Sequence, residues 1–205
     1  MAATMRKLAI VAAACLATGV INSPVAAQLG QSPGAKFLEA VKEEKNNEVV
    51  AAVNENGAAI VNTRDFSSRE TALHIVAKRG DVLYTRFLLQ KGGNPNLRDV
   101  RGSTPLLVAV SNGHADLVPV FVAAKANVNQ GNDSGETPLI KAVQRRDLVM
   151  VRELIAAGAD PDQADSLAGK SARIYANEDT RTPALAKIFA DIPKRERRAV
   201  SGPTL

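Results

Sequence analysis

A 33-residue period constrains what this chain can fold into more than any other feature. Three segments superimpose without gaps: TALHIVA from Thr71, TPLLVAV from Thr104 and TPLIKAV from Thr137. A second block recurs at the same spacing as GGNPN from Gly92, KANVN from Lys125 and GADPD from Gly158. A weaker fourth copy, GKSARIYA from Gly169, is shifted by one inserted residue. Self-similarity at this period predicts a solenoid, in which each unit buries its apolar face against the next unit.

Each copy carries the start and stop signals of two short helices. Thr104 and Thr137 suit the N-cap, and each is followed by a proline that suits the first helical position. Gly80 and Gly113 stand where the first helix has to end. Second helices are predicted over 82–90, 116–124 and 147–156. The side chains expected to form their buried stripes are Leu83, Phe87, Leu88, Leu117, Val120, Phe121, Leu148, Val151, Leu154 and Ile155.

The remaining sequence favours small-residue helix packing with capped ends. Aromatic residues make up only 3% of the chain, which favours packed helices over a β-sandwich. The small residues expected to let neighbouring helices approach closely are Ala77, Ala109, Ala142 and Ala176. A helix pair near 37–41 and 49–53 lacks the Thr-Pro start, and its outer residues are polar, as a terminal repeat requires. The last helix is expected near 182–190.

The period and the TPLHxA-like helix start resemble those of the ankyrin repeat over about residues 37–190. The chain further resembles exported ankyrin-repeat proteins of Gram-negative bacteria in KFLEAV from Lys36, ETPLI from Glu136 and GKSAR from Gly169. The resemblance implies an all-α solenoid of helix-turn-helix units. The expected divisions are a signal peptide (1–27), a leader (28–35), an N-terminal capping repeat (36–64), three repeats (65–97, 98–130 and 131–164), a degenerate C-terminal cap (165–191) and a basic tail (192–205).

Three positions depart from the repeat pattern. Lys125 stands where the other copies have glycine, so a side chain is expected at a left-handed helix C-cap. Arg146 replaces the inter-helix glycine of the third copy. The second copy has Leu107 in place of histidine, so His74 is expected to make the hydrogen bond to threonine that is typical of the family.

The first 27 residues have the pattern of a secretory signal. A short basic start precedes the apolar run 8–21, which is too short to span a bilayer comfortably, and VAA precedes the expected cleavage between Ala27 and Gln28. This pattern predicts a periplasmic or secreted protein. A buried N-terminal helix is the alternative, and acylation of Cys15, giving a membrane-anchored lipoprotein, is a second one. Cleavage after Ala27 leaves no cysteine in the mature chain.

The sequence offers few residues for catalysis or metal binding. It has two histidines and one cysteine, and it lacks a phosphate-binding glycine loop, a nucleophile elbow and a clustered carboxylate pair. His74 and His114 are far apart in the sequence and are expected to be structural. Residues 160–165 faintly resemble a calcium loop but lack its glycine and terminal glutamate. A non-enzymatic protein without metal or cofactor is therefore expected.

The formal charge of +5 comes from the two ends of the chain. Arg6 and Lys7 fall in the expected signal, and residues 194–198 carry four bases and one acid. The high isoelectric point therefore does not indicate a nucleic-acid-binding face. The tail could contact nucleic acid, anionic lipid or a cell-wall polymer, but a solvated tail is the preferred interpretation.

The resemblance implies that turn tips and first-helix surfaces form a concave face that binds another protein. The residues carried over to this face are Phe66, Ser67, Ser68, Glu70, Lys78, Arg79, Val100, Arg101, Ser103, Ser111, Asn112, Asp133, Ser134, Glu136, Gln144 and Arg145. Phe66 is either an exposed anchor or folded back onto the N-terminal cap. Arg79, Arg101 and Arg145 form an expected basic line that favours a partner with carboxylates. The alternative is that all these residues are merely solvated.

The expected function is a non-enzymatic protein-interaction module in the bacterial cell envelope, acting as a monomer on an unidentified protein partner. One alternative is a support or stress factor that binds and stabilises an envelope enzyme. Another is a protein that binds a small molecule or polymer, which would need a pocket with a perturbed carboxylate, and the sequence offers no candidate. No membrane span is expected in the mature form.

Overall fold

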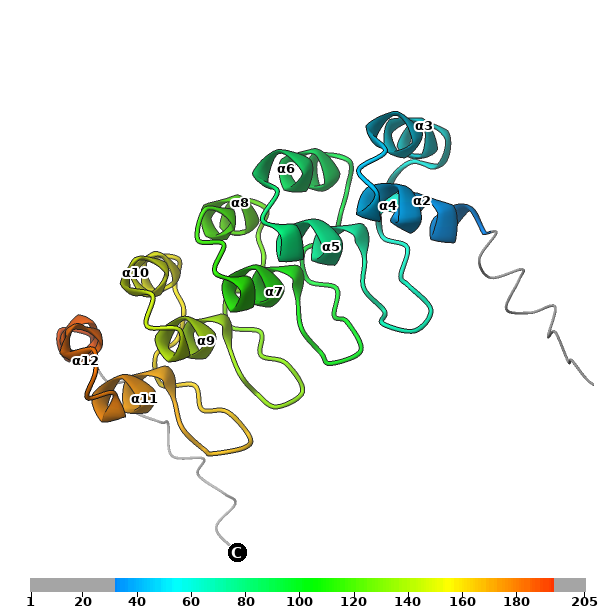
Figure 1. Cartoon of the computed structure of the whole chain (residues 1–205). Coiled ribbons are helices and arrows are strands. Elements are labelled where there is room, and N and C mark those ends of the chain that lie inside the picture. The colour runs from blue at the N-terminus through cyan, green and yellow to red at the C-terminus, as the bar shows by residue number, and fades with distance from the viewer. Residues whose placement is uncertain (1–31, 194–205) are drawn as a thin grey trace, which may run out of the picture.

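The computed structural model describes residues 32–193, which stack into a single row of helix pairs (Figure 1). The expected signal peptide, its cleavage site, Cys15 and the basic residues from 194 onward lie outside the described residues. Within 32–193 there are eleven helices and no strand, apart from one isolated bridge between Ala164 and Ser171. The prediction of an all-α repeat solenoid is therefore confirmed.

The helices form two layers, and long loops extend from the inner layer (Figure 1). The inner helices are α5 (Ala72–Arg79), α7 (Pro105–Asn112), α9 (Pro138–Gln144) and α11 (Ala172–Glu178). The outer helices are α6 (Val82–Gln90), α8 (Leu117–Ala123), α10 (Leu148–Ala156) and α12 (Pro183–Ala190). The N-terminal cap comprises α2 (Pro33–Lys42), α3 (Asn46–Asn56) and α4 (Ala58–Val61).

The residues predicted to begin and end the helices make the expected capping contacts. The Thr104 hydroxyl accepts a hydrogen bond from the backbone N–H of Leu107 at 3.3 Å, and Thr137 does the same for Ile140 at 3.2 Å. Gly80 adopts the left-handed conformation, with φ of 81°, between α5 and α6. Aspartates cap two of the outer helices, since Asp81 accepts from Tyr84 N and Asp147 from Met150 N. The repeated signals therefore reproduce one local geometry along the stack.

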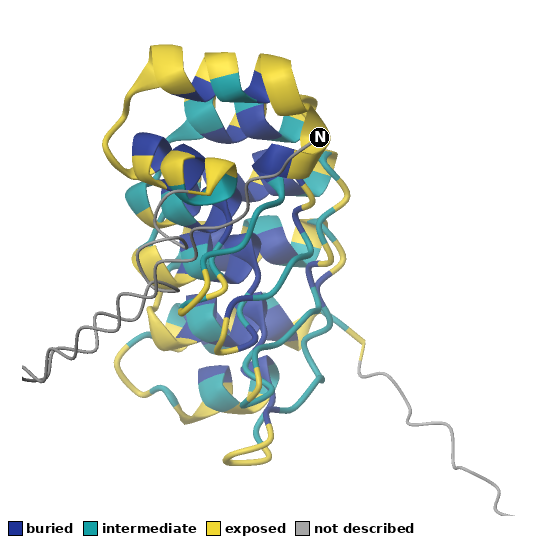
Figure 2. Cartoon of the chain, turned by 90° about the vertical axis from the view of Figure 1, so that its right-hand side faces the viewer, coloured by how far each residue is buried: buried dark blue, intermediate teal, exposed yellow. Residues whose placement is uncertain are grey.

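Buried residues run through the whole stack (Figure 2). The four predicted small residues, Ala77, Ala109, Ala142 and Ala176, have no exposed surface, which allows adjacent inner helices to pack closely. The predicted stripe of α6 is wrong at Leu83, which is 82% exposed. Leu83 lies five residues before the buried Leu88, so the two point about 140° apart around the helix. Thr85 takes the buried place, and its hydroxyl donates to Asp81 O at 2.6 Å.

Several residues other than glycine adopt the left-handed backbone conformation at positions where other repeats have glycine. Lys125 has a φ angle of 60°, as predicted, and Arg146, which replaces the inter-helix glycine, has a φ angle of 59°. Arg69 also has a positive φ, 57°, where the next two loops have Gly102 and Gly135. This conformation of Arg69 was not predicted, although Arg69, Gly102 and Gly135 each lie two residues before the N-cap threonine of the following helix, at the 33-residue spacing.

A row of side-chain amides links successive repeats on the side of the outer helices. Asn62 Oδ1 accepts from Asn94 N, Asn96 Oδ1 from Asn127 N and Asn129 Oδ1 from Asp160 N, each at 2.7 Å. Each amide therefore satisfies backbone groups of the following repeat. This explains why asparagine and aspartate recur at the 33-residue spacing.

The two ends of the stack are closed by specific contacts. The leader expected over 28–35 ends earlier, because α2 starts at Pro33 with Ser32 as its N-cap. The short α4 was not predicted. At the other end, the Arg173 guanidinium pairs with Asp162 at 2.7 Å and donates to the carbonyls of Phe189 and Ile192. Arg173 thereby fixes the C-terminal end of α12 against the preceding repeat.

Candidate interaction surface

Four finger loops, with tips at 65–70, 99–103, 132–136 and 165–170, extend from the inner helices. Each tip is closed by a side chain at its first position, which accepts backbone N–H groups further along: Asp65, Asp99, Asn132 and Asp165. The fingers also bond to one another, through Val100 N to Ser68 O, Asp133 N to Arg101 O and Ser166 N to Ser134 O. These bonds hold the fingers in a fixed row.

A groove of about 780 Å³ lies between the middle fingers and the inner helices. It brings together eleven of the sixteen residues that were predicted for the concave face: Glu70, Lys78, Arg101, Ser103, Ser111, Asn112, Asp133, Ser134, Glu136, Gln144 and Arg145. The fold therefore gathers these residues into one hollow, although they come from three different repeats.

Two of the groove's acids already have cationic partners within the chain. Asp133 pairs with Arg98 at 2.8 Å, and Glu136 pairs with Lys141. Burial alone would raise the pKa of Glu136, but hydrogen bonds from Lys141 and Asn132 outweigh it and hold the pKa below its ordinary value. Glu136 is therefore ionised near pH 7, and each of the two acids lies against a cation of this chain. Glu70 has no cationic partner in the part of the chain that the structure describes, and it accepts from the Ser68 hydroxyl at 3.3 Å.

Three groove cations, in contrast, have no carboxylate partner among residues 32–193. Lys78 and Arg101 are exposed, and neither side chain has a hydrogen bond or ion pair in the described part of the chain. Arg145 donates to the Ser111 carbonyl at 2.9 Å, which fixes the guanidinium across the groove without neutralising it. The groove therefore presents more unpaired positive charge than unpaired negative charge.

Arg79 does not belong to this basic line. Its guanidinium turns toward the N-terminal cap, donating to Val41 O at 3.2 Å and pairing with Glu44 and Asp81, each at 3.3 Å. It also lies over the Tyr84 ring. Lys78, one residue earlier, faces the groove, because adjacent helical residues point about 100° apart. Arg79 is a structural link, and Lys78 replaces it in the groove.

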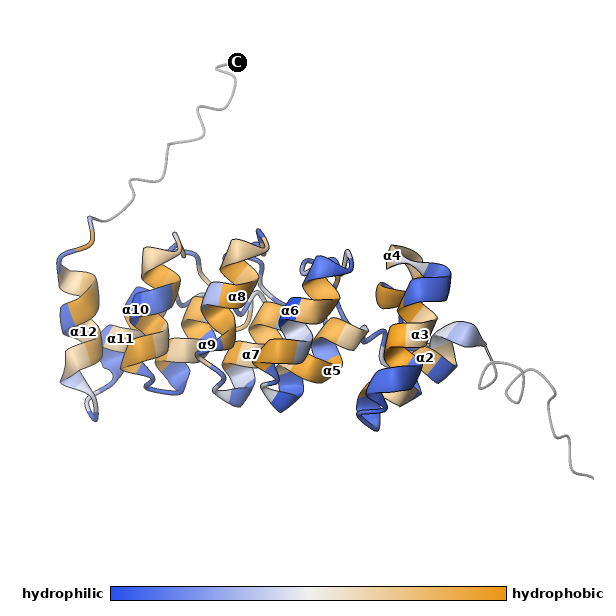
Figure 3. Cartoon of the chain, turned by 90° about the horizontal axis from the view of Figure 1, so that it is seen from above, coloured by the Kyte–Doolittle hydropathy of each residue, from blue (hydrophilic) through white to orange (hydrophobic). Residues whose placement is uncertain are grey.

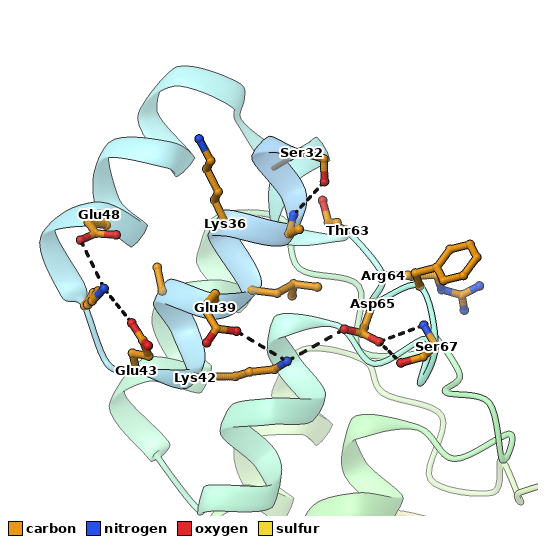
Figure 4. Close-up of a pocket in the computed structure, with 15 residues that line it drawn as sticks. Ser32, Lys36, Glu39, Lys42, Glu43, Glu48, Thr63, Arg64, Asp65 and Ser67 are labelled. Atoms are coloured by element: carbon orange, nitrogen blue, oxygen red, sulfur yellow. Dashed lines mark hydrogen bonds and ion pairs between the residues drawn. The ribbon is translucent and has the colours of Figure 1, made fainter. Parts of the chain in front are cut away.

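Phe66 and Val100 lie outside the groove on the finger tips. Phe66 is 82% exposed, so it does not fold back onto the cap. It lines a separate hollow of about 680 Å³ between the first finger and α2 (Figure 4). Most charges in this hollow are paired: Lys42 lies 4.0 Å from Glu39 and 3.9 Å from Asp65, and Lys45 lies 2.7 Å from Glu43. Val100 is 58% exposed on the side of the second finger that faces away from the groove.

Both histidines have structural contacts. His74 is fully buried; its Nδ1 accepts from Thr71 N at 3.1 Å, and its Nε2 lies 3.0 Å from the carbonyl of Ser103 in the next repeat. His114 Nε2 lies 3.0 Å from Lys78 O. Residues 32–193 contain no group of three or more histidine, cysteine or acidic residues placed to hold a metal ion.

Sequence reasoning missed three residues of the groove, Val108, Asn132 and Lys141. Each lies at or next to a framework position, so the repeat alignment assigned it to the scaffold. The sequence shows that Glu136 and Lys141 are five residues apart, but whether they form an ion pair depends on the bend of the third finger.

In the described part of the chain, no helix has the length and apolar character needed to cross a membrane.

Comparisons with known proteins give partial matches to proteins of varied kinds. A Fowlpox virus protein, named as an ankyrin repeat protein, is 36% identical over 75 residues, covering 36% of this chain and 22% of the viral protein. A potassium channel of Oryza sativa subsp. japonica is 43% identical over 54 residues, or 26% of this chain and 6% of the channel. The chain thus spans less than a quarter of the length of each of these relatives. The activities that their names describe are not assigned to this chain.

The family comparison covers most of the described structure. The family described as ankyrin repeats (3 copies) matches residues 25–132 and 73–165. These matches contain the first three finger loops, the groove and the helix pairs α2 to α10. Together with the period and the stacked helix pairs, they show that the chain belongs to the ankyrin repeat family.

Proposed function

We propose that this chain is a protein-interaction module that binds a carboxylate-rich segment of another protein in the groove between its fingers and inner helices. The family is generally non-enzymatic and typically binds proteins, which supports an interaction role. The fixed row of fingers supports it further, because a pre-ordered surface loses little conformational entropy on binding.

One observation carries the choice of partner chemistry. Lys78, Arg101 and Arg145 are the groove cations without a carboxylate partner in residues 32–193, whereas Asp133 and Glu136 are already paired. A partner with two or more carboxylates would pair with these cations. Arg145 is already oriented for such a contact by its hydrogen bond to the Ser111 carbonyl. Ser103 Oγ, Asn112 Oδ1 and Gln144 Nε2 have no hydrogen-bond partner within residues 32–193 and are available for hydrogen bonds to an extended backbone.

We further propose that the protein acts in the bacterial cell envelope. The support is the charged start, apolar run and small-residue exit of residues 1–27. Export is tested by mass spectrometry of the protein recovered from the periplasm. A mass matching a chain that begins at Gln28 supports the proposal, whereas a retained N-terminus contradicts it, and a lipid-modified Cys15 favours the lipoprotein alternative.

The groove is tested by affinity capture from a periplasmic extract with three baits. The first is the chain beginning at Gln28, and the second carries Lys78→Glu, Arg101→Glu and Arg145→Glu. The third is a matched control with Arg86→Glu, Arg152→Glu and Lys187→Glu, all exposed on the outer helices. Both variants change the net charge equally. Circular dichroism melts confirm that each bait is folded.

The expected result is a protein retained by the first and third baits and lost from the second. Its contact segment, mapped by cross-linking, should be acidic. Equal retention on all three baits would contradict the assignment of the groove. If the captured protein is an enzyme, an activity assay with and without the chain distinguishes a support factor from a passive interaction module.

A further inference from the structure

Two of the outer helices, α6 and α10, each carry an exposed aliphatic side chain one turn before an exposed arginine, whereas the repeat between them has Asp116 and Pro119 at these positions. On α6, Leu83 is 82% exposed, and Arg86 is exposed one helical turn further on. On α10, Val149 is 58% exposed, and Arg152 follows it by one turn. The two pairs stand two 33-residue periods apart, so they occupy the same place in their repeats. Each aliphatic residue and its arginine therefore share one outward helix face.

The other exposed bases on this surface outnumber its exposed acids by three to two. Lys91 directly follows α6, Lys125 lies two residues after α8 and Lys187 lies on α12, and all three are exposed. The exposed acids on these four helices and the residues flanking them are Asp116 and Asp191. None of the basic side chains named for this surface pairs with an acid within residues 32–193. The outer-helix face, defined by Leu83, Arg86, Lys125, Val149, Arg152 and Lys187, is therefore cationic as well as partly apolar.

The face has a clear limit at its N-terminal end. Glu48 and Glu55 are exposed on α3, so the positive surface begins at α6. Figure 3 views the molecule from the side of the outer helices, where hydrophobic and hydrophilic positions lie side by side.

We infer that the outer-helix face binds the surface of an anionic lipid bilayer. Cations near such a surface are attracted by its negative potential, and aliphatic side chains at the same level can enter the headgroup region. Nucleic acid fits less well, because single-stranded binding relies on exposed aromatic rings for stacking. The aromatic side chains of the outer helices, Tyr84, Phe87, Phe121 and Phe189, are partly or fully buried. Lipid binding on this face would leave the groove, formed by the inner helices and fingers, free for a protein.

The test uses sedimentation with large unilamellar vesicles of two compositions. One contains phosphatidylcholine alone, and the other contains equal parts of phosphatidylcholine and phosphatidylglycerol. The chain begins at Gln28, because the apolar run 8–21 would itself enter lipid. The expected result is binding to the anionic vesicles only, weakening as salt is raised from low to physiological concentration.

Two double variants locate the binding surface. Arg86→Glu with Arg152→Glu is expected to weaken binding at least about 25-fold, from about fivefold for each cation lost. The matched control, Lys78→Glu with Arg101→Glu in the groove, is expected to weaken it far less. Leu83→Ser with Val149→Ser keeps the charge and is expected to weaken binding about tenfold. If the glutamate variants fail the folding check, Arg86→Gln with Arg152→Gln replaces them.

Three results would overturn the inference. The first is that the chain binds neither kind of vesicle. The second is that the groove variant and the outer-helix variant lose binding equally, which would show attraction without a defined face. The third is that a DNA duplex binds more tightly than the anionic vesicles and competes with them through Arg86 and Arg152, which would assign the face to nucleic acid.

Discussion

His74 Nε2 lies 3.0 Å from the carbonyl oxygen of Ser103, so one buried side chain joins two consecutive repeats. The backbone N–H of Thr71 can only donate, so His74 Nδ1 must accept and Nε2 must carry the proton that binds Ser103. The neutral ring satisfies both contacts at once. Protonation would place a second proton on Nδ1 and break the bond from Thr71.

Stability is therefore expected to fall in mild acid. Burial lowers the pKa of His74 below its ordinary value of 6.5, so the native state binds this proton less readily than the unfolded chain. The stabilisation is present above pH 6.5 and is lost as the pH falls toward the native pKa. Urea unfolding at intervals between pH 7.5 and 5 measures it. In His74→Leu, which introduces the residue that the next repeat has as Leu107, this slope should vanish, with a loss of about 1–3 kcal/mol at pH 7.

Lys125→Gly should stabilise the protein by about 0.5–1 kcal/mol, because Lys125 holds a φ of 60° that glycine adopts without steric cost. Arg146→Gly is the matched control. Arg146 has a similar φ of 59°, but it pairs with Asp179 at 2.6 Å and should gain nothing when replaced. Thermal melts of both variants measure the difference. A lower melting point for Lys125→Gly would show that its backbone conformation carries no strain.

Glu153→Gln should stabilise the protein at pH 7 by a few tenths of a kcal/mol. Burial and the neighbouring Asp116 and Asp147 raise the pKa of Glu153, and its Oε2 has no hydrogen-bond partner within residues 32–193. A raised carboxyl pKa makes the charged form unfavourable above that pKa, so the benefit of glutamine should disappear as the carboxyl becomes protonated below about pH 4. Unfolding curves at pH 7 and pH 4 test this, and an unchanged difference would reject the electrostatic explanation.

Asp65 is expected to make the first finger sensitive to strong acid. Hydrogen bonds from the backbone N–H groups and hydroxyls of Ser68 and Ser67 lower its pKa to about 2. The resulting stabilisation is present above pH 3.8 and is lost as the pH falls toward 2. Asp65→Asn should keep most contacts, since Asn132 has the same role in the third finger, whereas Asp65→Ala should lose about 1–2 kcal/mol. Equal losses in the two variants would contradict this assignment.

Much of the fold could be predicted from the sequence, because the same local signals recur at one spacing. Thr104, Gly80 and Ala142 each act through contacts within one repeat or with an identical neighbour, so the pattern determines their environment. The wrong predictions concern residues whose surroundings differ from those of the equivalent residues in other repeats. The carbonyl of Val41, which turns Arg79 away from the groove, belongs to an N-terminal cap with no repeat to align to. Leu83 was misplaced because a one-residue difference in phase moves a side chain to another helix face.

The composition of the groove could be predicted better than its electrostatics. Eleven of the residues predicted for the concave face do meet in one hollow. Which charges remain unpaired could not be read from the sequence, because the Arg98–Asp133 and Lys141–Glu136 pairs depend on how neighbouring fingers lie against each other. The net positive character of the groove is therefore a property of the folded chain.

The central claim, that a carboxylate-rich protein segment occupies the groove, is tested most directly by site-specific photo-cross-linking. A photoreactive phenylalanine analogue is placed at Ser111, in the groove, or at Ala123, exposed on the outer helix α8, and the cross-linked partner peptide is sequenced by mass spectrometry. The prediction is an acidic peptide cross-linked at Ser111 and lost when Lys78 and Arg101 are changed to glutamate. Protein cross-links at Ala123 with none at Ser111 would place the partner on the other face and contradict the claim.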